Sequence, residues 1–120
     1  MTSPTQRTLA AVRKAGWTCQ TVERWCQFSR RRIDLFGVID IVCVRPGIVL
    51  GVQATSGSNL SSRQAKCLET AALASWLASG AQFEIWAWRK LTRGKKRPVW
   101  EPNVSRAVLA NGAVDFVSKE

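Results

Sequence analysis

The spacing of apolar residues divides the chain into helical stretches and extended ones. Residues 4–15 carry a short apolar stripe, follow a capping box made by Ser3 and Gln6, and end before Gly16, which predicts a first helix. A second capping box opens the stretch from Ser61 to Gly80, where apolar residues recur at helical spacing and predict a second helix.

Runs rich in β-branched and aromatic residues predict the strands. They cover residues 17–28, 38–45, 48–55 and 82–88, and a fifth short strand begins at Val99. The Pro46–Gly47 pair predicts a tight turn that joins the second and third strands into a hairpin. Residues 29–37 predict a loop or the start of a strand. From Asn103 onward the pattern is weak and fits a short helix or a further strand.

The order of these elements predicts the fold class. A helix, three strands, a second helix and two strands follow one another, so a helix separates the third strand from the fourth. This arrangement favours a βαβ crossover, which makes those two strands parallel. We therefore expect one α/β domain over residues 1–120, with a mixed central sheet of about five strands flanked by helices.

Composition narrows the classes of function. The chain has 18 Lys and Arg residues against 8 Asp and Glu residues, a net charge of +10, and no His. The absence of His excludes His-based acid–base catalysis and zinc sites that need imidazole. No apolar run approaches the roughly 20 residues of a membrane-spanning helix, and the first residues lack the apolar core of a secretory signal. The four cysteines form no CxxC pair, so we expect free thiols in a cytoplasmic protein.

The positive charge is concentrated in two clusters. Such clusters are typical of proteins that bind nucleic-acid phosphates, and a solvated basic surface is the alternative. The first cluster consists of Arg30, Arg31 and Arg32, and the second of Arg89, Lys90, Arg93, Lys95, Lys96 and Arg97.

Asp40 is an acidic interruption in an apolar strand. A buried carboxylate is costly unless it is paired or binds a cation. The predicted hairpin brings Gln53 beside it, and the carboxylate, the Gln53 side-chain oxygen and the Ala54 carbonyl together suit Mg²⁺ or Mn²⁺. The alternatives are an ion pair of Asp40 with Arg30 or Arg31, and a hydrogen bond from Gln53 within the protein.

This constellation resembles the PD-(D/E)XK nuclease superfamily, above all its Holliday-junction-resolvase-like and VRR-type branches, which are common in phages. Asp40 takes the aspartate position, residues 53–55 take the (E/Q)-x-K positions, and residues 60–64 resemble the L-S-x-x-Q that opens the following helix. The resemblance spans residues 34–88. It implies a restriction-endonuclease-like core, metal-dependent cleavage of DNA, branched DNA as one substrate, a homodimer, and a bacterial or phage-infected cytoplasm.

The chain departs from the family pattern in three ways. Thr55 stands where the family has lysine, a glutamine stands where it has glutamate, and residues 2–15 contain no carboxylate. Asp40 and Asp34 are then the anionic ligands that remain, so we expect weak metal binding. The superfamily allows the missing cation to come from the next helix, where Lys66 and Arg63 are the candidates.

Several of these residues have a purely structural alternative. Asp34 can cap the turn that follows it, Gln64 can cap a helix instead of binding phosphate, and Lys66 can be an ordinary solvated lysine. Two other functions also fit the sequence. One is a catalytically degenerate nuclease fold that only binds DNA, and the other is a basic adaptor or inhibitor that docks on an acidic protein.

Overall fold

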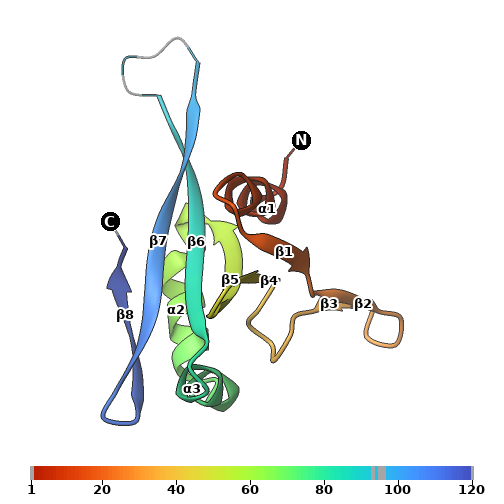
Figure 1. Ribbon diagram of the computed structural model, residues 1–120. Coiled ribbons are helices and arrows are strands. Elements are labelled where there is room, and N and C mark those ends of the chain that lie inside the picture. The colour runs from red at the N-terminus through yellow and green to blue at the C-terminus, as the bar shows by residue number, and fades with distance from the viewer. Residues whose placement is uncertain (1, 93, 95–96, 120) are drawn as a thin grey trace.

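The computed structural model describes residues 2–92, 94 and 97–119. Within this part of the chain, three α-helices pack on a six-stranded mixed sheet with the strand order β1-β4-β5-β6-β7-β8, and β2 and β3 form a separate two-stranded sheet (Figure 1). The helices are α1 (Pro4–Lys14), α2 (Leu60–Leu68) and α3 (Ala71–Ala78), and a 3₁₀ turn, η1, covers Gly57–Asn59. The strands are β1 (Thr18–Thr21), β2 (Arg24–Cys26), β3 (Arg31–Ile33), β4 (Ile41–Arg45), β5 (Ile48–Ser56), β6 (Gln82–Leu91), β7 (Val99–Ala110) and β8 (Ala113–Ser118).

The predicted α/β class and its crossover are confirmed. Strand β5 pairs antiparallel with β4 through the predicted turn and parallel with β6, and η1, α2 and α3 make the connection between β5 and β6. The remaining pairs of the main sheet are antiparallel. None of the helices in the described residues is long and apolar enough to cross a lipid bilayer.

Helix α1 forms where the sequence predicts it. The Ser3 hydroxyl accepts from the Gln6 backbone N–H and the Gln6 side chain accepts from the Ser3 N–H, which is a complete capping box. Gly16 adopts a φ of +97° just beyond the helix, a conformation that glycine tolerates better than other residues. The helix is tied to the sheet by Trp88, whose indole N–H donates to the buried Thr8 hydroxyl at 2.8 Å.

Three predicted boundaries are wrong. The strand expected over residues 17–28 breaks after Thr21, because the chain leaves the main sheet there to form the β2–β3 hairpin. The strand expected from residue 38 begins only at Ile41, after a tight turn that holds Phe36 at a φ of +54°. The strand predicted to begin at Val99 is not short but runs as β7 to Ala110, and β8 follows it, which agrees with the further strand that the pattern after Asn103 allows and not with a short helix.

The predicted helix from Ser61 to Gly80 is two helices. Helix α2 begins at Leu60 with no side-chain cap, so the capping box expected at Ser61 does not form. The break follows Leu68, where the Thr70 hydroxyl donates to the Lys66 carbonyl at 2.9 Å. Threonine side chains that bond to a backbone carbonyl in this way compete with helix continuation.

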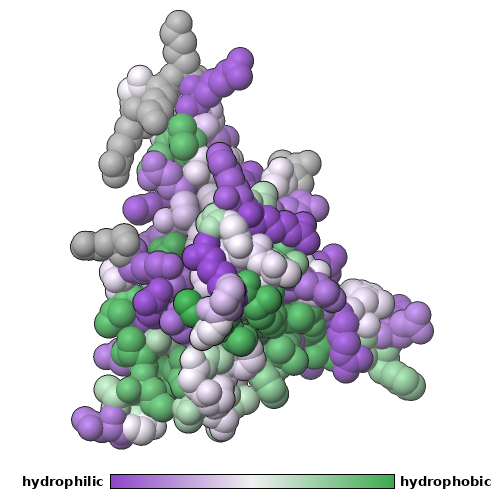
Figure 2. Space-filling model, in the orientation of Figure 1, coloured by the Kyte–Doolittle hydropathy of each residue, from purple (hydrophilic) through white to green (hydrophobic). Residues whose placement is uncertain are grey.

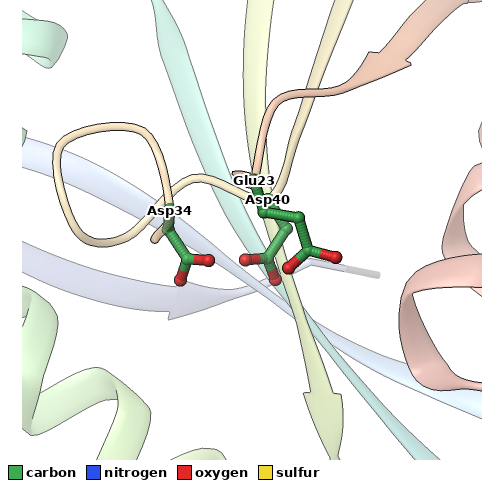
Figure 3. A group of neighbouring side chains, drawn as sticks. All are labelled: Glu23, Asp34 and Asp40. Carbon is green, nitrogen blue, oxygen red and sulfur yellow. The ribbon is translucent and has the colours of Figure 1, made fainter. Parts of the chain in front are cut away.

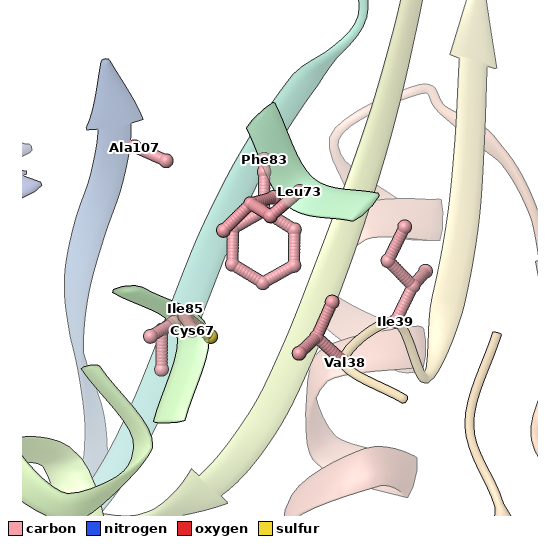
Figure 4. Close-up of a cluster of buried hydrophobic side chains, with 7 residues drawn as sticks. All are labelled: Val38, Ile39, Cys67, Leu73, Phe83, Ile85 and Ala107. Carbon is pink, nitrogen blue, oxygen red and sulfur yellow. The ribbon is translucent and has the colours of Figure 1, made fainter. Parts of the chain in front are cut away.

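Alternation along the strands divides the core between the two sheet faces. One cluster lies under α2 and α3 and includes Ile39, Phe83 and Ile85, together with Val38, Cys67, Leu73 and Ala107 (Figure 4). The other lies under α1 and includes Val12, Ile41, Cys43, Leu50 and Val52. Gly51 permits close packing on the first face, since an added Cβ would lie 2.9 Å from the Ile39 side chain.

Candidate metal centre

Three carboxylates meet at the end of the main sheet where the β2–β3 hairpin departs (Figure 3). Glu23 directly precedes β2, Asp34 directly follows β3, and Asp40 directly precedes β4. One oxygen from each of these side chains lies within 4.8 Å of the others. We call these three residues the acidic cluster.

Strand pairing explains why the acidic cluster forms. In the β2–β3 hairpin Arg24 pairs with Ile33, so Glu23 and Asp34 stand opposite each other one step beyond the last pair. The bridge between Leu35 and Ile39 closes the next turn and leaves Asp34 and Asp40 opposite each other. Two consecutive turns therefore bring three acidic residues, separated by up to seventeen positions, to one point.

Asp40 is held from three sides. Its backbone N–H donates to the Val52 carbonyl at 2.9 Å, and its carbonyl accepts from the Val22 N–H at 2.8 Å. Its carboxylate accepts from the Ala54 backbone N–H at 2.9 Å. In a continued sheet, a backbone carbonyl of the neighbouring strand would accept from this N–H instead. This anchoring on β5 fixes the carboxylate next to the residues that the sequence predicts as its partners.

In the described part of the chain, one member of the acidic cluster, Glu23, has a cationic partner, and the two aspartates have none. Burial raises the pKa of Asp40 to about 8, and the neighbouring Asp34 carboxylate raises it as well, whereas the hydrogen bond from Ala54 lowers it. Arg32 donates to Glu23 at 2.8 Å. Among residues 2–92, 94 and 97–119, no Lys or Arg forms an ion pair with Asp34 or Asp40, so the alternative pairing with Arg30 or Arg31 is not found.

The donor set fits a hard divalent cation. Carboxylate oxygens are ligands that Mg²⁺ prefers, and two oxygens bound to one Mg²⁺ at about 2.1 Å lie at most about 4.2 Å apart. Three ligands of one octahedral Mg²⁺ include at least two adjacent pairs about 3.0 Å apart, so the oxygens of the acidic cluster, which lie within 4.8 Å of one another, would need to move closer by up to about 2 Å. Rotation about the side-chain bonds of the half-buried Glu23 and Asp34 is the movement that this contraction requires.

Gln53 lies on β5 opposite Asp40, as the hairpin register requires. Its side chain is only 1% exposed, and its Oε1 accepts a weak hydrogen bond from the Cys67 thiol at 3.8 Å. Its Nε2 has no hydrogen-bond partner among the described residues, which is unusual for a buried amide. Ala54 directs its N–H to Asp40. Metal ligation by the Gln53 amide or the Ala54 carbonyl stays a prediction.

Of the two basic candidates on α2, Lys66 lies near the acidic cluster. The exposed Lys66 lines a cavity of about 170 Å³ together with Asp34, Arg31 and Arg32. Burial raises the pKa of the Cys67 thiol to about 11, the charges of Lys66 and Arg63 lower it, and that of Asp40 raises it. The contact of Cys67 with Gln53 places α2 on the side of the sheet that Gln53 faces.

Other residues predicted for phosphate binding have different surroundings. Gln64 points to the sheet and donates to the Ser105 hydroxyl at 3.0 Å, so it is not a helix cap. Arg89 and Lys90 are exposed at the end of β6, and Arg97 is exposed before β7. Arg93, Lys95 and Lys96, which belong to the same predicted cluster, lie outside the described residues.

A larger cavity of about 790 Å³ opens beside the acidic cluster. It lies between the start of α1 and the β2–β3 hairpin, and Glu23 belongs both to its lining and to the acidic cluster. Its lining consists of Ser3, Thr5, Gln6, Thr21, Glu23, Arg24, Trp25 and Arg32. The wall of this cavity therefore carries cationic and aromatic side chains next to one member of the acidic cluster.

Sequence reasoning missed Glu23 as a member of the site. Glu23 falls inside the stretch predicted as one strand, residues 17–28, where a lone acidic residue gives no sign of a site. The signal that could have identified it is the absence of a carboxylate in residues 2–15, because an acidic residue is then needed from another segment. Asp34 was the other anionic ligand expected from the sequence, and it lies in the cluster.

Comparison with known proteins adds no relative. No protein-family model, no curated protein and no solved structure matches this chain.

Proposed function

We propose that this protein is a divalent-metal-dependent endonuclease that cleaves DNA phosphodiester bonds. The observation that carries the proposal is the convergence of Glu23, Asp34 and Asp40, with no protein cation bound to the two aspartates among the described residues. A net charge of +10 supports a polyanionic substrate. The four unpaired thiols support a cytoplasmic location.

The residues of the site have distinct roles in this proposal. The two aspartates and Glu23 bind the metal, and Gln53 contributes a polar group from β5. When bound, the metal would polarise the scissile phosphate and lower the pKa of the attacking water. Lys66, which lines the cavity next to Asp34, supplies positive charge to the phosphate. Arg31 and Arg32 hold the adjacent phosphates and orient the strand.

Cleavage of labelled DNA with Mg²⁺ or Mn²⁺ tests the proposal. Asp40→Asn should lower the cleavage rate by at least about 100-fold, while DNA affinity stays unchanged or rises because a negative charge near phosphate is lost. Lys66→Ala should reduce cleavage more than binding. Glu69→Ala is the matched control, because Glu69 is an exposed carboxylate on the C-terminal side of α2, outside the acidic cluster.

Metal binding gives a second readout that does not depend on catalysis. Titration of the wild type with Mn²⁺ should raise the melting temperature, and Asp40→Asn should abolish the rise. Gln53→Glu should strengthen the binding, because it adds a carboxylate opposite Asp40. A wild type that neither binds Mn²⁺ nor cleaves any DNA would contradict the proposal.

Thr55 favours a second candidate, a nuclease fold that only binds nucleic acid. Thr55 is buried on β5 and has no charge to place beside a phosphate. DNA binding that persists without any metal-dependent cleavage would support this candidate. Affinity for acidic proteins without affinity for DNA would instead favour an adaptor or inhibitor.

A further inference from the structure

The β2–β3 hairpin projects from the body of the protein (Figure 1). It contains ten residues, 24–33, and we call it the arm. Glu23 and Asp34 lie at its two ends, so the base of the arm is part of the acidic cluster. A ligand bound at the base of the arm would therefore lie next to the candidate metal centre.

The arm combines exposed aromatic and cationic side chains. Phe28 is completely exposed in the turn, and Trp25 on β2 is 58% exposed. The arm also holds Arg24, Arg30, Arg31 and Arg32, and it has no acidic residue. Figure 2 shows this protrusion as largely hydrophilic, with a hydrophobic surface at its end. Single exposed apolar residues are common on proteins, but two aromatic residues among four arginines match a surface that stacks bases and binds phosphates.

The arm and the larger cavity form one continuous surface. Trp25, Arg24 and Arg32 line the cavity from the arm, and Ser3 and Gln6 line it from the start of α1. Glu23 also lines this cavity. A chain of nucleotides in the cavity would thus contact an aromatic ring and two guanidinium groups before it reached the carboxylates.

We propose that the arm binds unpaired bases of a nucleic acid strand, with Trp25 and Phe28 as stacking platforms next to the cleavage site. The position of the scissile phosphate rests on the proposed nuclease function, and the binding of unpaired bases does not. Phe28 stands five positions after Glu23, so the Cα atoms of these two residues lie at most about 17 Å apart. Stacked nucleotides are about 3.4 Å apart, so the arm spans about five of them.

Charge and area favour nucleic acid over a lipid surface. Two aromatic side chains provide much less apolar area than the amphipathic helices that bind membranes. An anionic lipid surface in contact with the arm would also lie against the carboxylates at its base and be repelled by them. A single strand of nucleic acid is flexible and can bend away from these carboxylates. Guanidinium groups also form bidentate hydrogen bonds with phosphate oxygens.

Fluorescence anisotropy in metal-free buffer with EDTA tests the arm without cleavage. The probes are a labelled single-stranded oligonucleotide and a blunt duplex of the same length. The wild type should prefer the single strand. Phe28→Ala and Trp25→Ala should each weaken single-strand binding about fivefold or more and leave duplex binding within about twofold. Phe28→Trp should retain single-strand affinity, because the indole ring can stack as well.

Leu109→Ala is the matched control, since Leu109 is an exposed apolar residue on β7, away from the arm. The salt dependence of duplex binding should be the same in all these variants, because no cationic residue changes. Stopped-flow quenching of Trp25 by the single strand should disappear in Trp25→Phe, which retains an aromatic ring.

Several results would overturn the arm as a base-binding element. One is an equal loss of single-strand and duplex binding in Phe28→Ala, and another is no loss in either. A third is binding of the wild type through Phe28 to vesicles that contain phosphatidylserine, with no binding to oligonucleotides. If no metal supports cleavage but the single-strand preference depends on Phe28 and Trp25, the nuclease proposal fails and the arm proposal stands.

Discussion

Two buried carboxylates, Glu84 and Asp40, interrupt apolar strand sequences in the same way but have opposite surroundings. Glu84 on β6 is completely buried and accepts hydrogen bonds from Trp86, Arg106 and Lys119 at 3.0, 3.1 and 2.9 Å. Asp40 is 5% exposed and accepts from the Ala54 backbone N–H, and its close side-chain neighbours are two more carboxylates.

The pKa values of these two carboxyl groups shift in opposite directions. Burial by itself would raise the pKa of Glu84, but the hydrogen bonds from Lys119, Trp86 and Arg106 outweigh it and hold the pKa below its ordinary value. Burial raises the pKa of Asp40 to about 8, and Asp34 adds to that effect. The protein itself neutralises Glu84, which connects β6 to β7 and to the end of the chain. It leaves Asp40 dependent on a proton or an external cation, and perturbed carboxyl groups of this kind are common at functional sites.

The largest expected effect is the pH dependence of stability that Asp40 causes. Its folded pKa of about 8 exceeds the ordinary value of 3.8, so the folded state retains a proton that the unfolded state releases. The contribution of Asp40 to the free energy of unfolding is complete below pH 4 and is lost as the pH rises through 8. Without metal, this loss is on the order of 5 kcal/mol.

Asp40→Asn should abolish most of this loss, because the amide cannot ionise and its oxygen can still accept from Ala54. Urea denaturation in EDTA at several pH values between 4 and 9 measures the effect. If the free energy of unfolding depends on pH equally in the wild type and in Asp40→Asn, the pKa of Asp40 is not raised, and the contrast with Glu84 is wrong.

Removal of the cations around Glu84 should make it resemble Asp40. The double variant Arg106→Ala/Lys119→Ala leaves a fully buried carboxylate without a charged partner, and we expect it to lose about 3–4 kcal/mol of stability at pH 7. The loss should shrink as the pH falls through the raised pKa of Glu84 in the variant, where the carboxyl becomes neutral, and should be smallest below the lowered pKa of Glu84 in the wild type. Lys14→Ala/Lys90→Ala, which removes two exposed cations elsewhere, is the control in the same denaturation experiment.

The smallest expected effect on stability is that of Glu23→Gln. Its ion pair with Arg32 is largely solvated, because the Arg32 side chain is 72% exposed, so the stability should change by less than about 1 kcal/mol. The same substitution should remove most of the Mn²⁺-induced rise in melting temperature, since it takes one of three carboxylates from the cluster. A strong loss of stability with an unchanged Mn²⁺ response would assign Glu23 to the fold alone.

Local sequence determined several elements of this protein directly. The capping box at Ser3, the turn at Pro46–Gly47 and the glycine after α1 act between neighbouring residues, so the sequence is enough to identify them. The helix between two apolar strands likewise predicted the parallel pairing of β5 and β6, because a crossover of that kind returns the chain in the same direction. The proximity of Gln53 to Asp40 followed from the hairpin register.

Only the tertiary structure decided which acidic residues act together. The runs around Asp40 and Glu84 look alike in sequence, and the difference arises from Arg106 and Lys119, which reach Glu84 from distant parts of the chain. Glu23 joined Asp34 and Asp40 because the chain leaves the main sheet after β1, forms the arm and returns. No local pattern encodes such a departure, since it depends on which strands pair, and pairing is a property of the whole sheet.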